Sequence, residues 1–256
     1  MTQPTILALV RHGESEWIAE GRFQGRGDPP LSDMGLRQAA AVAARMAAPA
    51  QMPSLPIPDH PPVAIWHSPL LRAAQTAQAI YEARAADAPL RSLDSLLELA
   101  QGEWEGLTHD EVRARYPEEL AAWRDDPLNN HAPGGESLRD ARARARQAWE
   151  TILDDDGEVT AADEGPGKLP AEPVLGYERA SEADDGPVWT LVVAHDGVLR
   201  LLMLDLLGMG IEHFWSFPLA LASVTVLDLS AGVVQLRAHN LDEHIAALSR
   251  AHGTTS

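Results

Sequence analysis

The chain of 256 residues contains no cysteine. This absence excludes a disulfide framework, a zinc site built on thiolates and a cysteine nucleophile. The apolar run near the N-terminus, residues 6–10, is too short for a secretory signal or a membrane span, and no basic region precedes it. We therefore expect a cytoplasmic protein that has no membrane partner.

Positive charge is also scarce in this sequence. Lysine and arginine together number 20, against 38 aspartates and glutamates, and the formal net charge is -18. This excludes nucleic acid as a partner, because nucleic acid phosphates require a basic face. A small phosphate ester is not excluded, since an arginine cluster in a pocket dominates the field at contact distance. Lys168 is the only lysine, so arginines, which suit bidentate phosphate contacts, carry nearly all the positive charge.

Hydrophobic residues make up 45% of the chain, which is enough to bury a core, and the sequence has no internal repeat. We therefore expect one domain over residues 1–256. Short β-type runs predict strands at residues 5–10, 63–67, 89–93, 188–194, 223–229 and 233–238. Runs rich in alanine, leucine and arginine predict helices at residues 36–47, 70–86, 137–153 and 199–207.

The alternation of these strands and helices predicts an α/β fold, a three-layer α/β/α arrangement around a mostly parallel sheet. No helix separates the last two strands, which are joined through residues 230–232. They predict a hairpin that gives the sheet one antiparallel strand. The exposed edge of that hairpin offers a contact for a homodimer.

Two segments differ in composition from the rest of the chain. Residues 49–62 contain six prolines and predict an irregular connection. Residues 154–187 contain eleven acidic and two basic residues, half of the net charge, with four prolines and five glycines. This composition predicts a flexible acidic insertion. The alternative is a regulatory lid or a tail that binds a partner.

Reactive side chains stand directly after three predicted strands. Arg11-His12-Gly13-Glu14 follows the first strand, residues 68–72 follow the second, and His195-Asp196-Gly197 follows a later one. The carboxyl ends of parallel strands are where α/β folds bind ligands. Phosphoryl transfer requires a nucleophile, cations around the phosphate oxygens and a proton for the leaving alkoxide. Two imidazoles and two guanidinium groups at one sheet edge would supply most of this chemistry.

Further motifs lie between these strands: Gln24-Gly25, Glu98, Gly102-Glu103-Trp104-Glu105-Gly106 and Pro133-Gly134-Gly135-Glu136-Ser137. In this order the motifs, from residue 6 to about residue 245, resemble those of the histidine phosphatase superfamily, the group that includes phosphoglycerate mutases. The resemblance implies a small helical cap, at residues 99–136, within the single domain. It implies no cofactor and no metal.

The resemblance also implies a role for each reactive side chain. His12 would become a phosphohistidine that water hydrolyses, and Arg11 and Arg72 would bind the phosphate and lower the pKa of His12, which keeps it neutral. His195 would act as an imidazolium beside the bound dianion. Glu98 matches the family's proton donor, and the neighbouring phosphate would raise its pKa. Its competitors are Glu14, Glu103 and Glu105.

A second set of residues is expected around the substrate: Ser15, Gln24, Gly25, Asp196 and Gly197. Helix capping explains Ser15 equally well, and for Asp196 it is the favoured role. The backbone N–H groups near Gly197 are expected to point at the bound anion, because they begin a helix.

Four further residues complete the candidates. We expect Ser68 to cap the following helix, with Arg72 exposed in its second turn. The tryptophans are expected to pack in the interior, with Trp104 the exception that contacts a substrate. His109 and His131 are weaker candidates for substrate contact from the cap.

The sequence departs from the family pattern at a few positions. Ile18 stands where many members have an asparagine that donates to phosphate, and Gln24 is a candidate replacement. Gln101 and Asp125 stand where bisphosphoglycerate-dependent mutases have a tyrosine and an arginine. An aspartate there opposes a bisphosphorylated cofactor, so hydrolysis is favoured.

We therefore predict a metal-independent phosphomonoesterase of the phosphatase branch, acting on a small phosphorylated metabolite. The first alternative is a phosphoglycerate mutase that depends on bisphosphoglycerate. The second alternative is a non-catalytic phosphate-binding protein.

Overall fold

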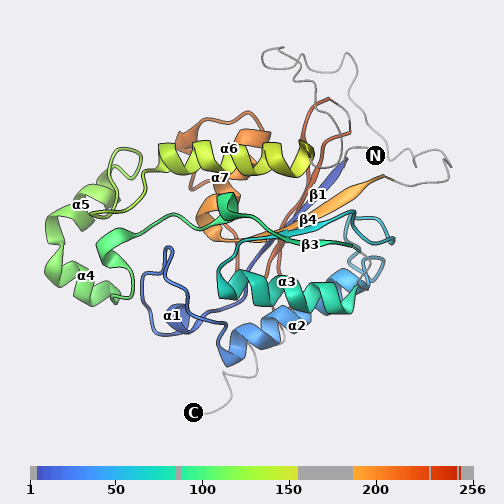
Figure 1. Cartoon of the computed structure of the whole chain (residues 1–256), viewed down its shortest axis with the longest axis horizontal. Coiled ribbons are helices and arrows are strands. Elements are labelled where there is room, and N and C mark those ends of the chain that lie inside the picture. The colour runs from blue at the N-terminus through green and yellow to red at the C-terminus, as the bar shows by residue number, and fades with distance from the viewer. Residues whose placement is uncertain (1–4, 85–87, 155–186, 231, 247, 249–256) are drawn as a thin grey trace.

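The computed structural model describes residues 5–84, 88–154, 187–230, 232–246 and 248. Six strands form one sheet in the order β3-β2-β4-β1-β5-β6 (Figure 1). Their bounds are β1 Ile6–Arg11, β2 Ile65–His67, β3 Leu90–Ser92, β4 Trp189–Ala194, β5 Val224–Asp228 and β6 Gln235–Leu241. The first four strands are parallel, and β5 runs antiparallel to both of its neighbours, β1 and β6. The predicted fold class, including the hairpin, is confirmed.

Seven α-helices occur in the described part of the chain. Their bounds are α1 Glu16–Ala19, α2 Asp33–Ala47, α3 Leu71–Ala83, α4 His109–Arg115, α5 Pro117–Asp125, α6 Leu138–Asp154 and α7 Asp196–Leu206. Three short 3₁₀ helices, at Asp94–Leu96, Gly102–Trp104 and Ile211–His213, lie in the connections. Among the described residues, no helix has both the length and the apolarity that a membrane span requires.

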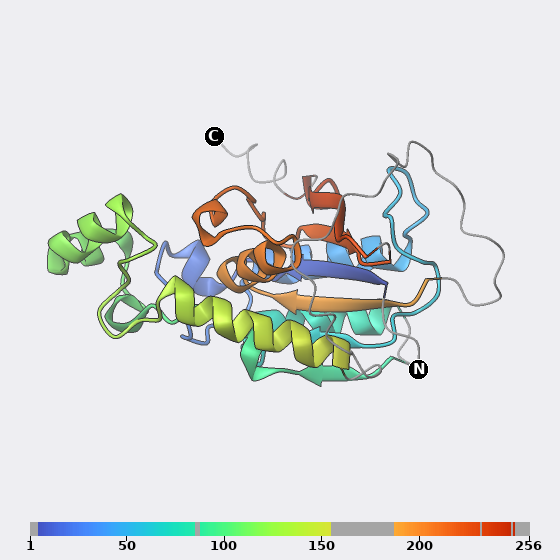
Figure 2. The ribbon, with the colours of Figure 1, turned by 90° about the horizontal axis from the view of Figure 1, so that it is seen from above.

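The sheet separates two helix layers, α6 with α7 on one face and α2 with α3 on the other (Figures 1 and 2). Side chains of β1 alternate between these layers, as the two-residue period of a strand requires. Leu7 and Leu9 belong to the cluster with α6 and α7, whereas Ala8 and Val10 belong to the cluster with α2 and α3. The buried strand therefore holds both halves of the core together and fixes the position of its own C-terminal end.

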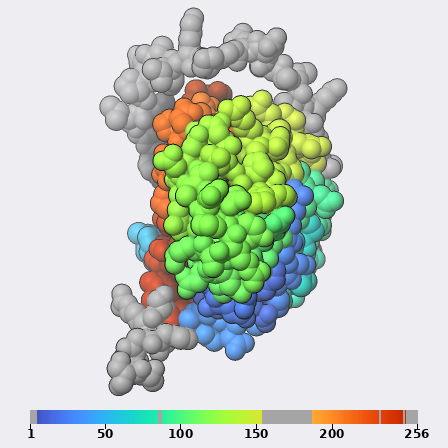
Figure 3. Space-filling model, turned by 90° about the vertical axis from the view of Figure 1, so that its left-hand side faces the viewer, coloured from blue at the N-terminus to red at the C-terminus, as the bar shows by residue number. Residues whose placement is uncertain are grey.

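Helices α4 and α5 lie at one end of the molecule, beside the layers rather than on a face of the sheet (Figure 1). They have a small core of their own, formed by Trp104, Val112, Leu120 and Ala132. Figure 3 shows this segment, in green, across the middle of the face at that end of the molecule. These helices fall within residues 99–136, the predicted cap.

Two helices begin earlier than the sequence indicated. Helix α2 begins at Asp33, because the Ser32 hydroxyl accepts a hydrogen bond from the Gly35 N–H and caps it. Helix α7 begins at Asp196, directly after β4. The proline-rich residues 49–62 contain neither helix nor strand, as predicted. The predicted acidic insertion, residues 154–187, lies outside the described residues apart from its two ends.

Candidate active site

Three neighbouring parallel strands end at one edge of the sheet. In the registers of the β1–β4 and β2–β4 pairs, Arg11 lies opposite Ala194 and His67 lies opposite Val193. The residues that follow, His12, Ser68 and His195, are therefore brought together, and the His12 and His195 ring centroids are 4.9 Å apart. The two histidines are 183 positions apart in the sequence, and the sheet topology alone makes them neighbours.

The His12 ring is buried and held in one orientation. Its exposed fraction is 2%, and its Nδ1 lies 2.6 Å from the carbonyl oxygen of Gly13. Because a carbonyl only accepts hydrogen bonds, Nδ1 carries the proton and Nε2 carries the lone pair. Burial, together with the charges of Arg72 and Arg11, holds the pKa of His12 well below its usual range. The side chain is therefore a neutral imidazole with a nucleophilic nitrogen.

Two arginines surround this ring, and each is anchored by backbone oxygens. Arg72 donates to the carbonyls of Gly27 and Gly25, both at 2.8 Å, and Arg11 donates to that of Leu219. Within the described structure, the Nε atoms of both arginines are buried and have no hydrogen-bond partner. Burial lowers the pKa of Arg72 to about 10, so the group keeps its charge at neutral pH. These unused donors suit an anion.

The expectation that Arg72 is exposed in the second turn of its helix is wrong. The side chain is fully buried and belongs to the first turn of α3. Ser68 does not cap this helix either, since the N-cap is Leu70 and makes no side-chain cap bond. The Ser68 hydroxyl accepts only a long hydrogen bond, 3.4 Å, from the N–H of Leu70, and its shorter contact is with Nε2 of His195 at 2.7 Å. A serine after a strand end has the local signal of a helix cap, and its long-range partner His195 does not appear in the local sequence.

The His195 ring is also fully buried. Its Nδ1 has no hydrogen-bond partner among the described residues. Burial first, then the charges of Arg72, His12 and Arg11, holds the pKa of His195 well below its usual range. A phosphate dianion would reverse the sign of this local field and favour the protonated ring.

Glu98 reaches the same cavity from the loop after the first 3₁₀ helix. Its carboxylate accepts hydrogen bonds from the backbone N–H groups of Leu99 (2.9 Å), Gly197 and Val198 (both 3.2 Å). Burial raises the pKa of Glu98, and the hydrogen bonds from Leu99 and Gly197 oppose that rise. In this structure the amides of Gly197 and Val198, in the first turn of α7, therefore donate to Glu98, and the expectation that they bind the phosphate stays a prediction.

The competing carboxylates have other partners. Glu14 accepts from the Ser32 hydroxyl, Glu103 from the Tyr116 hydroxyl, and Glu105 from the backbone N–H of Gln101. None of the three carboxylates is among the described residues that line the cavity, whereas Glu98 is.

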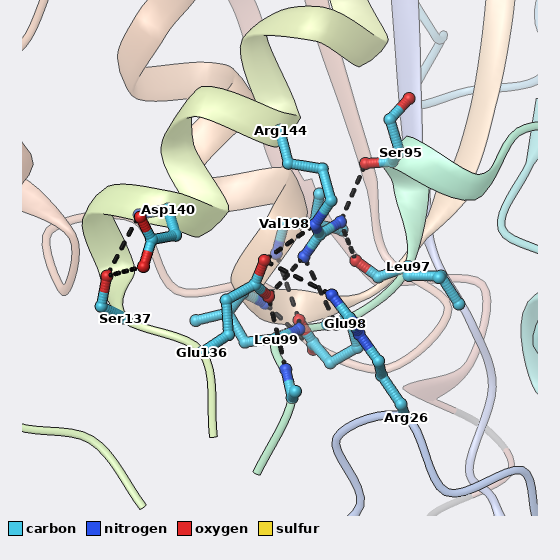
Figure 4. Close-up of polar contacts among 12 residues, drawn as sticks. Arg26, Ser95, Leu97, Glu98, Leu99, Glu136, Ser137, Asp140, Arg144 and Val198 are labelled. Atoms are coloured by element: carbon cyan, nitrogen blue, oxygen red, sulfur yellow. Dashed lines mark hydrogen bonds and ion pairs between the residues drawn. The ribbon is translucent and has the colours of Figure 1, made fainter. Parts of the chain in front are cut away.

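Arg144 of α6 holds the loop that carries Glu98 (Figure 4). It donates to the carbonyls of Ser95 (2.9 Å), Leu97 (2.6 Å) and Glu98 (3.4 Å). Glu136 pairs with Arg144 at 2.7 Å and also lies 3.4 Å from Arg26 (Figure 4). Arg144 is a positioning residue that the sequence motifs did not single out; it directly precedes Ala145 in a helix whose alanines at 141, 145 and 148 recur at helical spacing.

The predicted substrate-binding set divides into two groups. Gln24, Gly25, Asp196 and Gly197 line the cavity. Ser15 is fully buried, caps α1 and donates to Oε1 of Gln24 at 2.6 Å, which leaves the Gln24 amide nitrogen for other acceptors. Because of this contact, capping is not the only role of Ser15: it also orients a residue of the cavity wall.

Asp196 does not cap α7, because the N-cap position belongs to His195. Its Oδ1 accepts from Nε of Arg200 at 3.0 Å and lies 3.7 Å from Arg11. The predicted capping role for Asp196 is therefore wrong. Its carboxylate contacts one arginine beside His12 and another arginine in α7.

The cavity has a volume of about 360 Å³ and two chemically different ends. We call the first the polar end; it comprises Arg11, His12, Arg72 and Glu98. We call the second the aromatic end; it comprises Phe23, His109, Trp123, Phe214 and Trp215. Within the described residues no group of three or more histidine, aspartate or glutamate side chains could hold a metal ion.

The tryptophan that sequence analysis selected is not part of either end. Trp104 is fully buried and packs in the core of the α4–α5 segment. Trp123 and Trp215, which were expected to pack in the interior, line the cavity instead. Of the two candidate histidines, His109 lines this cavity and His131 borders a separate, smaller hollow.

The comparison with protein families agrees with this geometry. The model of the histidine phosphatase superfamily (branch 1) matches residues 7–162 and 172–242. The chain belongs to the histidine phosphatase superfamily. Phosphoserine phosphatase 1 of Hydrogenobacter thermophilus is 30% identical over 223 residues, which cover 87% of this chain and 86% of that protein. Glucosyl-3-phosphoglycerate phosphatase of Mycolicibacterium vanbaalenii is 32% identical over 209 residues, 81% of this chain and 76% of that protein.

Solved structures give the same result. Mycobacterial glucosyl-3-phosphoglycerate phosphatase in complex with VO3 has a TM-score of 0.70 and 26% identity, over 93% of this chain and 100% of that one. This histidine phosphatase is a hydrolase of phosphate monoesters, as its phosphatase homologues indicate. The predictions of its family and of this reaction class are confirmed.

Proposed function

We propose that this histidine phosphatase hydrolyses a small phosphate monoester in two steps, with His12 as nucleophile and Glu98 as proton donor. In the first step Nε2 of His12 forms a bond to phosphorus as the ester P–O bond breaks. The proton of Glu98 passes to the leaving alkoxide. In the second step the oxygen of water forms a bond to phosphorus as the Nε2–P bond breaks. Glu98, now a carboxylate, takes a proton from that water, inorganic phosphate leaves, and His12 is neutral again.

One observation carries this proposal: a neutral His12 ring, its Nδ1 bound to Gly13, lies beside the half-buried Arg11 and the fully buried Arg72, whose buried Nε donors have no partner in the described structure. The nitrogen is nucleophilic because it has no proton, and the arginines match the oxygens of a phosphoryl group. Burial raises the pKa of Glu98, so the carboxyl keeps its proton to higher pH than a solvated glutamate does. His195 adds a further donor beside the ring of His12.

The test is a phosphoryl-trapping experiment with the variant His12→Ala. Wild-type protein, mixed with ³²P-labelled ester and quenched in base, is expected to retain acid-labile label. The variant is expected to lose both the label and turnover by a factor of at least about 10³. The exposed His60 gives a matched control, and His60→Ala should behave like the wild type. Unchanged labelling and turnover in His12→Ala would contradict the proposal.

Hydrolysis is favoured over mutase transfer by the charges at the aromatic end. A bisphosphorylated cofactor needs cations for its second phosphate. Among the described residues that line this part of the cavity, Arg22 is the available cation, and its Nε already contacts Glu20 at 2.6 Å. Asp125 is exposed and lies outside the cavity lining. Interconversion of phosphoglycerate isomers in the presence of bisphosphoglycerate would identify a mutase instead.

Three further predictions complete the proposal. We expect the chain to act in the cytoplasm, to use residues 99–136 as a cap over the substrate, and to form a homodimer through β6. Strand β6 lies at one edge of the sheet, which is consistent with such a contact. Sedimentation measurements on the purified chain would test the homodimer.

A further inference from the structure

We propose that this phosphatase selects esters whose alcohol carries an aromatic or heteroaromatic ring, and discriminates against alcohols that carry a carboxylate. This proposal rests on the proposed function, because it concerns the half of the ester that leaves from the same cavity. It depends on the aromatic end and on the pairing of Arg22, the arginine that lines the cavity beside it.

The aromatic end forms a continuous series of rings. The Trp123 and Trp215 ring centroids are 6.3 Å apart at an angle of 81°, and those of Trp215 and Phe214 are 4.9 Å apart at 82°. Trp104 links Trp123 to Phe23 from behind, with centroid distances of 5.9 and 5.3 Å. Edge-to-face contacts of this kind hold each ring in a fixed orientation. The wall of the cavity therefore presents preformed ring surfaces.

Trp215 is the ring best placed to meet a ligand. It is 53% exposed, although it lines the cavity, and Arg200 lies over its ring at 5.1 Å from the centroid. Arg200 is itself held by Asp196. The guanidinium of Arg200 holds the Trp215 indole in place. The cost in conformational entropy is small, because Asp196 already orders Arg200. Such an exposed apolar surface gains most from covering by another apolar ring.

The charge distribution opposes a carboxylate in the same place. Arg22 lines the cavity, but its Nε donates to Glu20 at 2.6 Å, and its Nη1 donates to the carbonyl of Gly106 and lies 3.8 Å from Glu111. Its guanidinium therefore faces two carboxylates already. A third carboxylate, on the substrate alcohol, would meet this negative field without a free cation among the described residues of the aromatic end.

The experiment compares three primary alkyl esters, whose leaving alcohols have similar basicity: ethyl phosphate, 2-phenylethyl phosphate and O-phosphoserine. For the wild type, kcat/KM for 2-phenylethyl phosphate is expected to exceed the other two values by at least about tenfold. Trp215→Ala should remove most of this preference, because it should lower kcat/KM for 2-phenylethyl phosphate much more than kcat/KM for ethyl phosphate. Trp215→Phe should keep the preference, because it retains a ring.

Trp149→Ala is the matched control, because this tryptophan of α6 is half-buried and lies outside the cavity lining. It should leave the preference unchanged. Similar kcat/KM for the three esters, or a preference for O-phosphoserine, would overturn the inference if hydrolysis still depends on His12. Folded protein that hydrolyses none of the three would overturn the proposed function as well.

Discussion

The two ends of the cavity are built in different ways. At the polar end, His12 directly follows β1, and the neighbouring His195 follows the adjacent strand β4. Backbone carbonyls or amides fix the side chains of His12, Arg72 and Glu98. At the aromatic end, the rings come from loops and short helices away from the sheet, and they fix one another by edge-to-face contacts. The sheet thus positions the reacting groups. The side chains around the substrate alcohol lie on loops and short helices, whose sequence can change without disturbing the sheet.

The largest effect we expect after loss of His12 comes from the proton donor. Glu98→Gln keeps the shape and one acceptor oxygen for the N–H groups of Leu99 and Val198. It replaces the oxygen that accepts from Gly197 by an NH₂ donor, and it removes the transferable proton. With ethyl phosphate, kcat should fall by about 10²–10⁴. With p-nitrophenyl phosphate the fall should be much smaller, since that leaving group needs no proton. Steady-state kinetics with both esters checks this, and equal losses for the two would contradict the role of Glu98.

The same variant should change the pH profile. Because the pKa of Glu98 is raised, the wild type keeps the acid form to higher pH, and kcat should fall as pH rises through that pKa. Glu98→Gln should lack this alkaline decline. The pKa of His12 is lowered, so the nucleophile stays neutral to lower pH than an ordinary histidine. A wild-type alkaline limb that persists in the variant would assign the titration to another group.

A smaller effect is expected from the residue that positions Glu98. Arg144→Met frees the carbonyls of Ser95, Leu97 and Glu98, so the carboxyl should occupy its productive position less often. We expect kcat for ethyl phosphate to fall about tenfold, with KM nearly unchanged and the alkaline limb displaced. Arg142→Met is the control: Arg142 lies on the same helix but donates to Asp205 and Met209. Equal losses in both variants would indicate a general effect on α6.

The smallest effect concerns charge at the aromatic end. Glu20→Gln removes a carboxylate that pairs with Arg22, so the arginine becomes available to a carboxylate on the substrate. Exposed pairs are weak, and kcat/KM for O-phosphoserine should rise only about two- to threefold, with ethyl phosphate unchanged. Glu82→Gln, an exposed carboxylate of α3, is the control. A rise for both esters would show a general electrostatic effect instead of local selection.

The comparison of the two ends also explains which features the sequence could predict. Strand ends are local features of the sequence. The apolar runs therefore predicted the strands and the fold class, and they placed His12 and His195 directly after two strand ends. Ser68 has its partner His195 far away in the chain, and Asp196 contacts the distant Arg11 as well as the nearby Arg200, whereas local patterns favoured capping for both. Buried rings and cavity rings have the same local sequence signals, so Trp104 and Trp215 could not be told apart. The burial of Arg72 likewise depends on carbonyls of the distant residues Gly25 and Gly27.

Asp196 is shared between the two ends. Its Oδ1 lies 3.7 Å from Arg11 and 3.0 Å from Arg200, which stacks on Trp215. The same carboxylate therefore positions Arg11, which would bind the phosphate, and Arg200, which holds the Trp215 indole in place. In a double-mutant cycle, substitutions at Arg11 and Trp215 should be additive once Asp196 is replaced, and non-additive while it is present. The binding free energies at the two ends are thus coupled at one point, the Oδ1 atom of Asp196, which contacts an arginine of each.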